Sequence, residues 1–496
     1  MGKLIKLEIT EADRFKPAER LERKLREGIV GQEWAVKETI RRFSRRLAGI
    51  SNPELPVAVL FIAGPTGVGK TEFAKVLAKV WREPTIFTCP FSFCGWEQHE
   101  LEIREELERG TSSLSPSDAK RFWEWLKNPE KWLEEHKDDP NPSPITRCPL
   151  CILRGDLRGT SDEPVGKVYM RSQSNLVAID CSQLGGTSRH NISKLIGAPA
   201  GYVGYGDRAR FHPRNLMGSI KVVLFDEFEK GIYDAYGGQT DFVNLLLRIL
   251  DEGKIEVSTG EEEGVAEASF SNCIIVFTSN IGSKKILEKA GQGEEVIGFL
   301  RYTEGSKKRL SEYTHGELKK LNDSIYDLIR DEVKNTIAPE LYNRIAFRGR
   351  LIVFRFLTDD EYIEILSKKV LNPLRERLEQ RKLGIVIEYT EEAKKVILKE
   401  TGDDREYGAR PLEAIANKRI VDKIADFINC GKIEPGDRII VKTEPGIDED
   451  TGKEVEVLAF FAEREGAYLP GSELNGTELF PLNADEESNG PEQEDS

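Results

Sequence analysis

The segment GPTGVGKT, residues 64–71, has the glycine, lysine and threonine spacing of a phosphate-binding loop. It follows the apolar run AVLFIA and precedes the helical pattern EFAKVLAKVW, which is the strand–loop–helix order that such a loop requires. Backbone N–H groups of residues 67–70 can face phosphate oxygens at the start of that helix. Lys70 would neutralise charge on the β- and γ-phosphates, and the Thr71 hydroxyl would ligate Mg²⁺. The predicted ATP-binding residues of the loop are Gly64, Pro65, Thr66, Gly67, Val68, Gly69, Lys70 and Thr71.

Three polar residues at the ends of two other apolar runs would complete a hydrolytic site. KVVLFDEFEK places Asp226 and Glu227 at the end of a predicted strand, where α/β proteins form ligand sites. Asp226 suits Mg²⁺ binding through a water, and Glu227 suits polarising the attacking water as a general base. Asn280, at the end of CIIVFTSN, is placed to bind the γ-phosphate or to orient that water. Alone, these residues would also fit solvated strand ends and a turn. The phosphate loop favours the catalytic interpretation.

Two cysteine pairs, in CPFSFC and CPLC, have spacings compatible with a tetrahedral zinc site. The four candidate ligands are Cys89, Cys94, Cys148 and Cys151. Structural zinc would stabilise a small module that has little core of its own. Free thiols are the alternative, a redox pair is a third interpretation, and His99 or His136 could replace one ligand.

The runs VAVLFIAG, NLVAIDCS, KVVLFDEF and CIIVFTSN are short, continuous and apolar, with helical patterns between them. Buried parallel strands have this pattern, which predicts an α/β fold with helices on both faces of a parallel sheet. Residues 82–172 interrupt the alternation and are interpreted as an inserted module. The predicted units are a large nucleotide-binding domain of residues 1–81 and 173–357, the insert, a small and mainly helical domain of residues 358–462, and an acidic disordered tail of residues 463–496.

The chain of 496 residues has 72 Lys and Arg against 86 Asp and Glu, a net charge of −14. This balance argues against broad binding to nucleic-acid phosphates, which needs a basic surface. No apolar run is long enough to span a bilayer, and the first residues lack the apolar core of a signal peptide. A cytoplasmic protein without a membrane partner is therefore expected. A reducing compartment favours metal binding over disulfides for the paired cysteines.

A set of motifs occurs in an order that resembles the AAA+ Clp unfoldases: IVGQEWAV, GPTGVGKT, LIGAPAGYVGYG, VVLFDEFEK, VFTSNIGS, PELYNRI and YGARPLEAI. The likeness is greatest to the second ATPase module of the two-ring members, and it covers about residues 20–81 and 173–462. It implies an AAA+ P-loop NTPase followed by a small lid domain, assembled as a homo-hexameric ring. It also implies that hydrolysis of ATP, with Mg²⁺, drives unfolded or tagged proteins through the central pore.

The resemblance assigns roles to further polar residues. Asn280 would be the first sensor, and Arg410, in YGAR, would be the second sensor contributed by the small domain. Arg344, in NRI, would be the arginine finger that reaches the ATP of the neighbouring subunit and stabilises the developing phosphoryl charge. The chain then reads AFRGR, which is more basic than the family pattern, so Arg348 or Arg350 could share this role. Each arginine also fits a surface salt bridge.

The resemblance also assigns apolar contacts. Ile29 and Val30 would pack near the adenine of the nucleotide. The GYVG motif would be the pore loop, in which Tyr202 and Val203 grip the translocating chain through contacts that need no particular substrate sequence. An ordinary flexible surface loop is the simpler interpretation of this glycine-rich stretch.

Two features bear on partners. The tripeptide Ile297-Gly298-Phe299 lies where Clp unfoldases carry the I-G-F-type contact with the Clp peptidase, although a buried loop anchor would look the same. The tryptophans of the insert would either pack its own core or help it recognise a substrate or adaptor. Three alternatives stay open: a stand-alone remodelling chaperone, a nucleic-acid motor that uses the insert, and an ATP-binding switch. The acidic balance disfavours the second of these, and the intact catalytic set disfavours the third.

Overall fold

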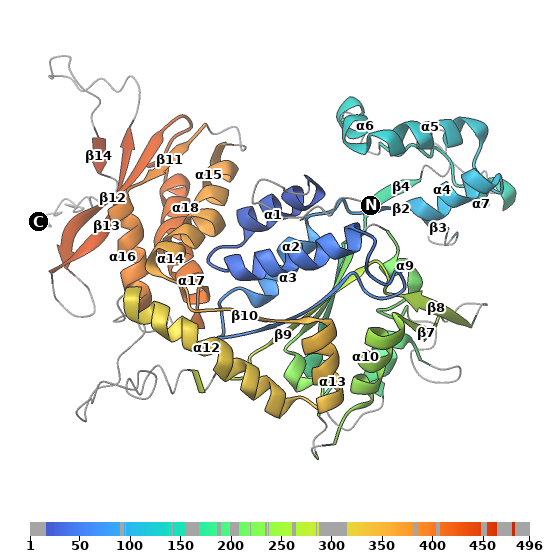
Figure 1. The fold of residues 1–496 in the computed structure, drawn as a ribbon. Coiled ribbons are helices and arrows are strands. Elements are labelled where there is room, and N and C mark those ends of the chain that lie inside the picture. Colours follow the sequence, from blue (N-terminus) through green and yellow to red (C-terminus); the bar gives the residue numbers. More distant parts are fainter. Residues whose placement is uncertain are drawn as a thin grey trace, which may run out of the picture.

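The computed structural model describes most of the chain between Lys16 and Pro481 (Figure 1). The described residues are 16–89, 94, 96–137, 139, 142–154, 168–185, 190–198, 208–218, 220–233, 236, 238–259, 264–283, 285–286, 315–379, 384–402, 407–447, 454–463 and 479–481. Tyr202 and Val203 of the GYVG motif lie outside these residues, and so does the Ile297-Gly298-Phe299 tripeptide.

A five-stranded parallel sheet forms the centre of the large domain, with strand order β10-β1-β9-β6-β5. The strands are β1 (Ala58–Ala63), β5 (Leu176–Asp180), β6 (Lys221–Asp226), β9 (Cys273–Ser279) and β10 (Arg350–Val353). β1 and β9 are buried along their whole lengths, as expected for central strands covered on both faces. The predicted parallel α/β sheet is therefore confirmed.

Helices cover both faces of this sheet (Figure 1). α1 (Lys16–Gly28), α2 (Glu33–Leu47) and α3 (Lys70–Ala78) pack on one face through Leu25, Val36 and Phe73. The other face carries α10 (Asp241–Glu252), α12 (His315–Thr336) and α13 (Pro339–Asn343). Shorter elements flank this layer: α8 (His190–Ile196), α9 (Pro213–Leu216) and a hairpin of β7 (Lys254–Ser258) and β8 (Val265–Ser269). Each helix buries one apolar stripe, which fixes its side toward the sheet.

The insert, residues 82–172, has an antiparallel sheet and a hydrophobic core of its own. Its strands are β2 (Thr85–Thr88), β3 (Glu97–His99) and β4 (Tyr169–Ser172). Its helices are α4 (Glu100–Arg109), α5 (Pro116–Lys127), α6 (Pro129–Glu135) and α7 (Pro149–Arg154). Trp125 and Trp132 are buried in this core beside Phe87 and Phe122. These two tryptophans therefore pack the insert, as the first of the two interpretations expects.

The small domain combines helices with a four-stranded sheet of order β11-β12-β13-β14. The helices are α14 (Asp359–Leu366), α15 (Asn372–Leu378), α16 (Glu391–Thr401), α17 (Arg410–Ala416) and α18 (Asp422–Asn429). The strands are β11 (Val386–Tyr389), β12 (Arg438–Ile447), β13 (Glu454–Glu463) and β14 (Leu479–Pro481). β14, from the segment predicted to be a disordered tail, pairs antiparallel with β13.

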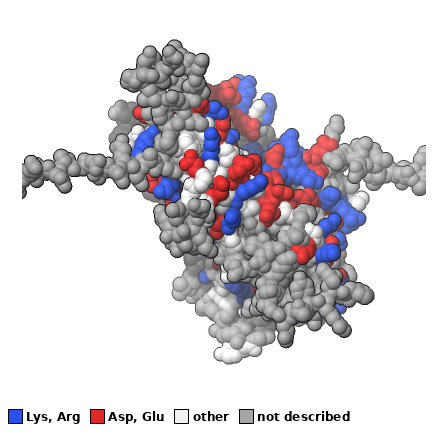
Figure 2. Space-filling view, turned by 90° about the vertical axis from the view of Figure 1, so that its left-hand side faces the viewer, with Lys and Arg blue, Asp and Glu red and all other residues white. Residues whose placement is uncertain are grey.

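Acidic and basic side chains are interspersed on the face shown in Figure 2, where the described residues form no uniformly basic patch. The described part of this face therefore lacks the continuous positive surface that binds a phosphate backbone. Within the described parts of the chain, no helix combines the length and the apolar character needed to cross a bilayer.

Candidate active site

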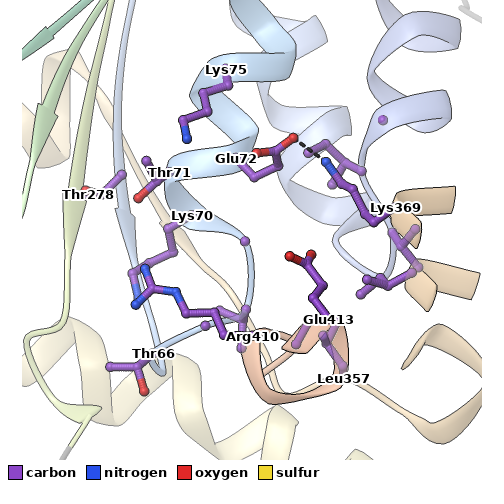
Figure 3. Close-up of a pocket in the computed structure, with 18 of the residues that line it drawn as sticks. Thr66, Lys70, Thr71, Glu72, Lys75, Thr278, Leu357, Lys369, Arg410 and Glu413 are labelled. Carbon is purple, nitrogen blue, oxygen red and sulfur yellow. Dashed lines mark hydrogen bonds and ion pairs between the residues drawn. The ribbon is translucent and has the colours of Figure 1, made fainter. Parts of the chain in front are cut away.

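A cavity of about 540 Å³ lies between the central sheet and the small domain, a volume typical of small-molecule sites (Figure 3). Several segments that are distant in sequence line it. The predicted site residues in its lining are Ile29, Val30, Thr66, Gly67, Val68, Gly69, Lys70, Thr71, Asp226, Glu227, Asn280 and Arg410. Gly64 and Pro65 lie at its edge, where their carbonyl oxygens accept hydrogen bonds from Lys70.

The phosphate loop touches the small domain directly. Gly67 has a φ of +70°, and a Cβ at this position would lie 1.8 Å from the carbonyl oxygen of Tyr407. The Ala409 N–H donates to the Gly67 carbonyl at 3.1 Å. Only glycine fits here, because both the backbone conformation and the space exclude a side chain. A change at the phosphates can therefore be transmitted to the small domain through this contact.

Lys70 is 7% exposed and surrounded by oxygen atoms. Its Nζ donates to the carbonyl oxygens of Gly64 at 2.9 Å and Pro65 at 2.5 Å, and to Oδ1 of Asn280 at 2.9 Å. Burial lowers the pKa of Lys70 to about 8, although Glu229 and Asp226 act in the opposite direction. Phosphate oxygens are the natural replacement for these neutral acceptors, because they add negative charge.

We expect ATP affinity to fall at pH values above about 8. Lys70 is protonated below that pKa in the free protein, so binding there needs no proton. Above it, binding must take up a proton because phosphates raise the lysine pKa, and affinity should fall about tenfold for each pH unit. Titration calorimetry in buffers of different ionisation enthalpy would measure this uptake. Lys70→Arg is the control, since its guanidinium stays charged. If the affinity of the unaltered protein for ATP did not change with pH, the expectation would be contradicted.

A hydroxyl and a carboxylate meet at the predicted magnesium position. The Thr71 hydroxyl donates to Oδ1 of Asp226 at 2.8 Å, and the Thr278 hydroxyl donates to the same oxygen. Oxygen donors of this kind fit Mg²⁺, which keeps several waters and binds few protein ligands. The sequence analysis missed Thr278. The sequence feature that could have indicated Thr278 is the alternation of side chains along the strand, which puts residues 278 and 280 on the same side of the sheet.

Glu227 has a backbone φ of +53°, the one positive value among the non-glycine residues that the structure describes. A non-glycine residue in this region is strained, and such strain persists where the surroundings hold it. Here the Glu227 N–H donates to the Thr278 hydroxyl at 3.3 Å, and Lys230 pairs with the Glu227 carboxylate at 2.5 Å. The turn ends β6 and brings Glu227 into the lining of the cavity.

Glu229 supports the first-sensor position and was also missed. Its Oε1 accepts a hydrogen bond from the Asn280 backbone N–H at 3.1 Å, while Oε2 is buried and has no hydrogen-bond partner among the described residues. Its negative charge acts on Lys70, which the Asn280 side chain contacts. The third acid of the DEFEK motif is the sequence signal for this role.

The lining of the cavity also includes apolar side chains, beside the charged Lys368 and Lys369. These apolar residues are Ile29 and Val30, Leu357 just before α14, and Ile365 within α14. Gln32 ties the two sides together: its side chain donates to the Arg355 carbonyl at 3.1 Å and accepts from the Arg355 N–H at 3.2 Å. These four side chains offer apolar surface of the kind that a nucleotide base requires.

Comparison with known families agrees with this geometry. The family described as "AAA domain (Cdc48 subfamily)" matches residues 158–348, and the "C-terminal, D2-small domain, of ClpB protein" matches residues 357–441. The two matches follow one another along the chain. In these two domains the chain is similar to the Clp-type AAA+ ATPases. The phosphate loop lies before the first matched range, and the fold brings it to the matched residues.

The curated relatives of this chain are Clp subunits and chaperones. The ClpA homolog of Cyanidium caldarium, named as an ATP-dependent Clp protease ATP-binding subunit, is 28% identical over 90% of this chain and 37% of its own length. The ClpC subunit of Staphylococcus epidermidis is 28% identical over 87% of this chain and 37% of its own. The chloroplastic chaperone protein ClpD1 of Oryza sativa is 28% identical over 86% and 32%. The chain thus spans about a third of the length of these relatives.

The arginines predicted as second sensor and arginine finger occupy two different places. Arg410, at the start of α17, lines the cavity. Arg344 is absent from the lining and binds Asp251, with Nε 2.7 Å from Oδ2. Arg350 pairs with Glu38 at 3.1 Å and lies over the Trp34 ring. The side chain of Arg348 is outside the described parts of the structure.

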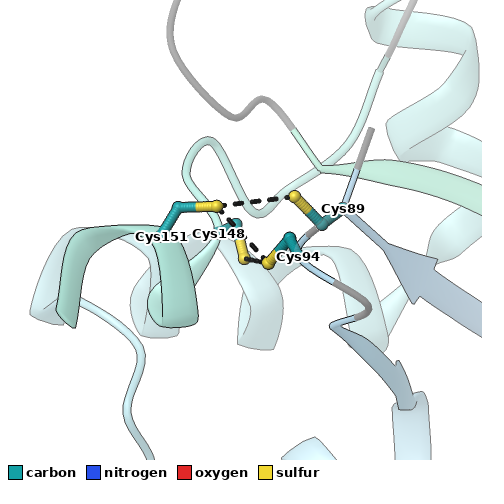
Figure 4. A group of neighbouring side chains, drawn as sticks. All are labelled: Cys89, Cys94, Cys148 and Cys151. Carbon is teal, nitrogen blue, oxygen red and sulfur yellow. Dashed lines mark hydrogen bonds between the residues drawn. The ribbon is translucent and has the colours of Figure 1, made fainter. Parts of the chain in front are cut away.

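The four predicted zinc ligands meet in the insert of the ATPase (Figure 4). All four sulfur atoms lie within 4.8 Å of one another. Cys89 and Cys151 are 3.7 Å apart, Cys94 and Cys148 are 3.6 Å apart, and Cys94 and Cys151 are 3.4 Å apart. Four thiolates about 2.3 Å from zinc in a tetrahedron would be about 3.8 Å apart, so the cluster fits this ion. Burial, together with the neighbouring thiols, raises the pKa of Cys148 to about 11, a cost that a bound cation would reverse.

Proposed function

We propose that this Clp-type ATPase couples ATP hydrolysis to the unfolding and threading of proteins through the pore of a homo-hexameric ring. One observation carries the proposal. The cavity joins the phosphate loop, the Asp226–Glu227 pair and Arg410, whereas Arg344 lies outside the lining of its own subunit's cavity. An arginine placed in this way can complete the site of a neighbour, which ties hydrolysis to assembly.

In this proposal ATP binds with its phosphates on residues 66–71 and its base near Ile29 and Val30. Thr71 and Asp226 would hold Mg²⁺, which screens the phosphate charge. Glu227 accepts a proton from the attacking water, and Asn280 orients that water against the γ-phosphate. Loss of the γ-phosphate shifts the contact between the phosphate loop and Gly408–Ala409, and the resulting domain movement drives the pore loop.

Unfolded protein is expected to stimulate ATP hydrolysis severalfold, and Tyr202→Ala should retain the basal rate but lose the stimulation. The reason is that the ring of Tyr202 would grip the substrate without contacting the nucleotide. Phosphate release with and without an unfolded protein measures both rates. Tyr236→Ala is the matched control, because that tyrosine is 88% exposed and lies outside the GYVG motif. Stimulation by DNA instead of protein would favour the nucleic-acid motor.

A Clp-type peptidase is the partner that we propose for the Ile297-Gly298-Phe299 tripeptide. Two of the relatives are named as ATP-binding subunits of the Clp protease, which supports this choice. Co-purification with such a peptidase should be lost in Phe299→Ala. Absence of any complex would favour the stand-alone chaperone; the rice relative is named a chaperone protein. Because some relatives are chloroplastic, the cytoplasmic location stays a prediction.

We also propose that Cys89, Cys94, Cys148 and Cys151 hold a structural zinc ion. Removing it with a chelator should unfold the insert, because four cysteines, three of them buried, would lose the cation that holds them together. Elemental analysis should find one zinc per chain, and Cys148→Ser should abolish it. Cys430→Ser is the control, since that cysteine is exposed and distant in sequence from the cluster. A metal-free insert with unchanged thermal stability would contradict the assignment.

A further inference from the structure

The insert is joined to the chain segment that follows the GYVG motif. This segment, residues 208–216, ends in α9 and lies beside β3 and α4 of the insert (Figure 1). Two ion pairs connect them: Arg208 with Glu97 and Arg214 with Glu102. Both pairs link residues more than a hundred positions apart, so they are contacts between two folded units and not local helix pairs.

Glu97 is the centre of the first connection. Its Oε1 is 2.8 Å from the Arg208 guanidinium, and its Oε2 is 2.8 Å from that of Arg171 on β4. The Glu97 side chain is 21% exposed. Although burial acts in the opposite direction, Arg208 and Arg171 hold the pKa of Glu97 below its ordinary value. A carboxylate shared by two arginines, and partly removed from water, positions both partners more firmly than an exposed pair does.

The insert's backbone makes Glu97 a stiff attachment point. Glu97 pairs with Thr88 across β2 and β3, and the Cys89 N–H donates to the Trp96 carbonyl at 2.9 Å, which links this strand pair to a residue of the cysteine cluster. The Glu102 carboxylate accepts two hydrogen bonds at the start of α4. Its Oε2 accepts from the His99 backbone N–H at 2.9 Å, and its Oε1 accepts from Arg214 Nε at 2.9 Å. Both carboxylates therefore project from ordered structure that the cysteine cluster and the cap hold in place.

The same segment is held on its other side by α8, which precedes the motif. The Arg210 N–H donates to the Lys194 carbonyl at 3.0 Å, and the Phe211 N–H donates to the Leu195 carbonyl at 2.9 Å. α8, before the GYVG motif, and the 208–216 segment, after it, are thus bound to each other, and the insert is bound to the 208–216 segment. A force on the motif is transmitted to α8 and to the insert at once.

We infer that Glu97 is a positioning residue, which with Glu102 fixes the 208–216 segment against the insert and so sets how strongly a protein substrate stimulates ATP hydrolysis. The inference rests on the proposed function for its link to substrate, but the fixation of the segment is a separate physical claim. Glu97 touches neither nucleotide nor the cavity. Its removal should therefore leave basal hydrolysis unchanged and loosen the segment.

The test compares Glu97→Gln with Arg171→Gln in the full chain. Glu97→Gln should accelerate hydrogen exchange in the peptide covering residues 208–216 about threefold to fivefold, the size expected for a partly buried ion pair. It should raise the concentration of unfolded protein needed for half-maximal stimulation by a similar factor. Arg171→Gln removes the other partner of Glu97 within the insert but keeps the Glu97–Arg208 pair, and should change both quantities clearly less than Glu97→Gln does.

A double-mutant cycle shows whether Glu97 acts through Arg208. Arg208→Gln should reproduce the Glu97→Gln phenotype, and the double variant should be no worse than either single variant. Additive effects, or unchanged exchange in Glu97→Gln, would overturn the inference. If exchange accelerates as expected while unfolded protein fails to stimulate even the unaltered protein, the proposed function fails and the positioning role stands.

Discussion

Glu227→Gln is expected to abolish ATP hydrolysis while ATP still binds. Glutamine keeps the shape of the side chain and leaves Lys70 and Thr71 untouched, but its amide cannot accept a proton from the attacking water. A general base contributes about 10²-fold to 10⁴-fold to rate, so the turnover number should fall by that factor. Phosphate release gives the rate, and equilibrium binding of a fluorescent ATP analogue gives the affinity.

Glu413→Gln is the matched control for this experiment. Glu413 lines the same cavity from α17, but it comes from the small domain and not from the strand end that carries Asp226 (Figure 3). Its loss should change turnover by less than about threefold, because it makes no proton transfer. If Glu227→Gln kept most of the rate, the base would have to be another acid of the same motif, and Glu229 would be the first to replace.

Arg344→Ala is expected to lower ATP turnover by about 10³-fold to 10⁵-fold, with ATP affinity retained. The arginine would stabilise charge that develops in the transition state, which is absent when ATP merely binds. In the isolated subunit Arg344 binds Asp251 and does not reach the cavity. Its effect should therefore appear only in assembled rings, and turnover per subunit should rise with protein concentration in the unaltered protein.

Mixing two inactive variants distinguishes a finger that acts across the boundary from a local salt bridge. Rings built from equal amounts of Arg344→Ala and Glu227→Gln subunits should regain activity at about a quarter of their boundaries, where an intact Glu227 meets an intact Arg344. Asp251→Asn should not reproduce the loss, although it breaks the pair seen here. Inactive mixtures that assemble and exchange subunits normally would contradict the trans role.

Arg350→Ala is the control for the second basic position. Arg350 pairs with Glu38 and lies over Trp34 within its own subunit. Its replacement should reduce stability by about 1 kcal/mol or less, without a comparable loss of turnover. A loss as large as that of Arg344→Ala would mean that the basic AFRGR stretch shares the finger's role.

The amino-acid sequence alone determined the local features of this protein. Continuous apolar runs predicted β1, β5, β6 and β9. β1, β6 and β9 have such runs because they are buried on both faces, whereas β5, at the edge of the sheet, alternates between buried and exposed residues. β10 was missed: RLIV is short, and an arginine precedes its apolar residues. The phosphate loop was evident from residues 64–71, since the chemistry of a phosphate cradle depends on neighbours in sequence.

Only the tertiary structure decided which distant residues meet. Thr278 and Glu229 became part of the site because β9 and β6 are adjacent in the sheet. Cysteine spacing indicated two pairs, but the folding of the insert brought the pairs within 4.8 Å of each other. The Glu97–Arg208 contact had no sequence signal at all. Contacts of this kind depend on the packing of whole elements, and a surface glutamate that will find a distant arginine looks like any other solvated acid.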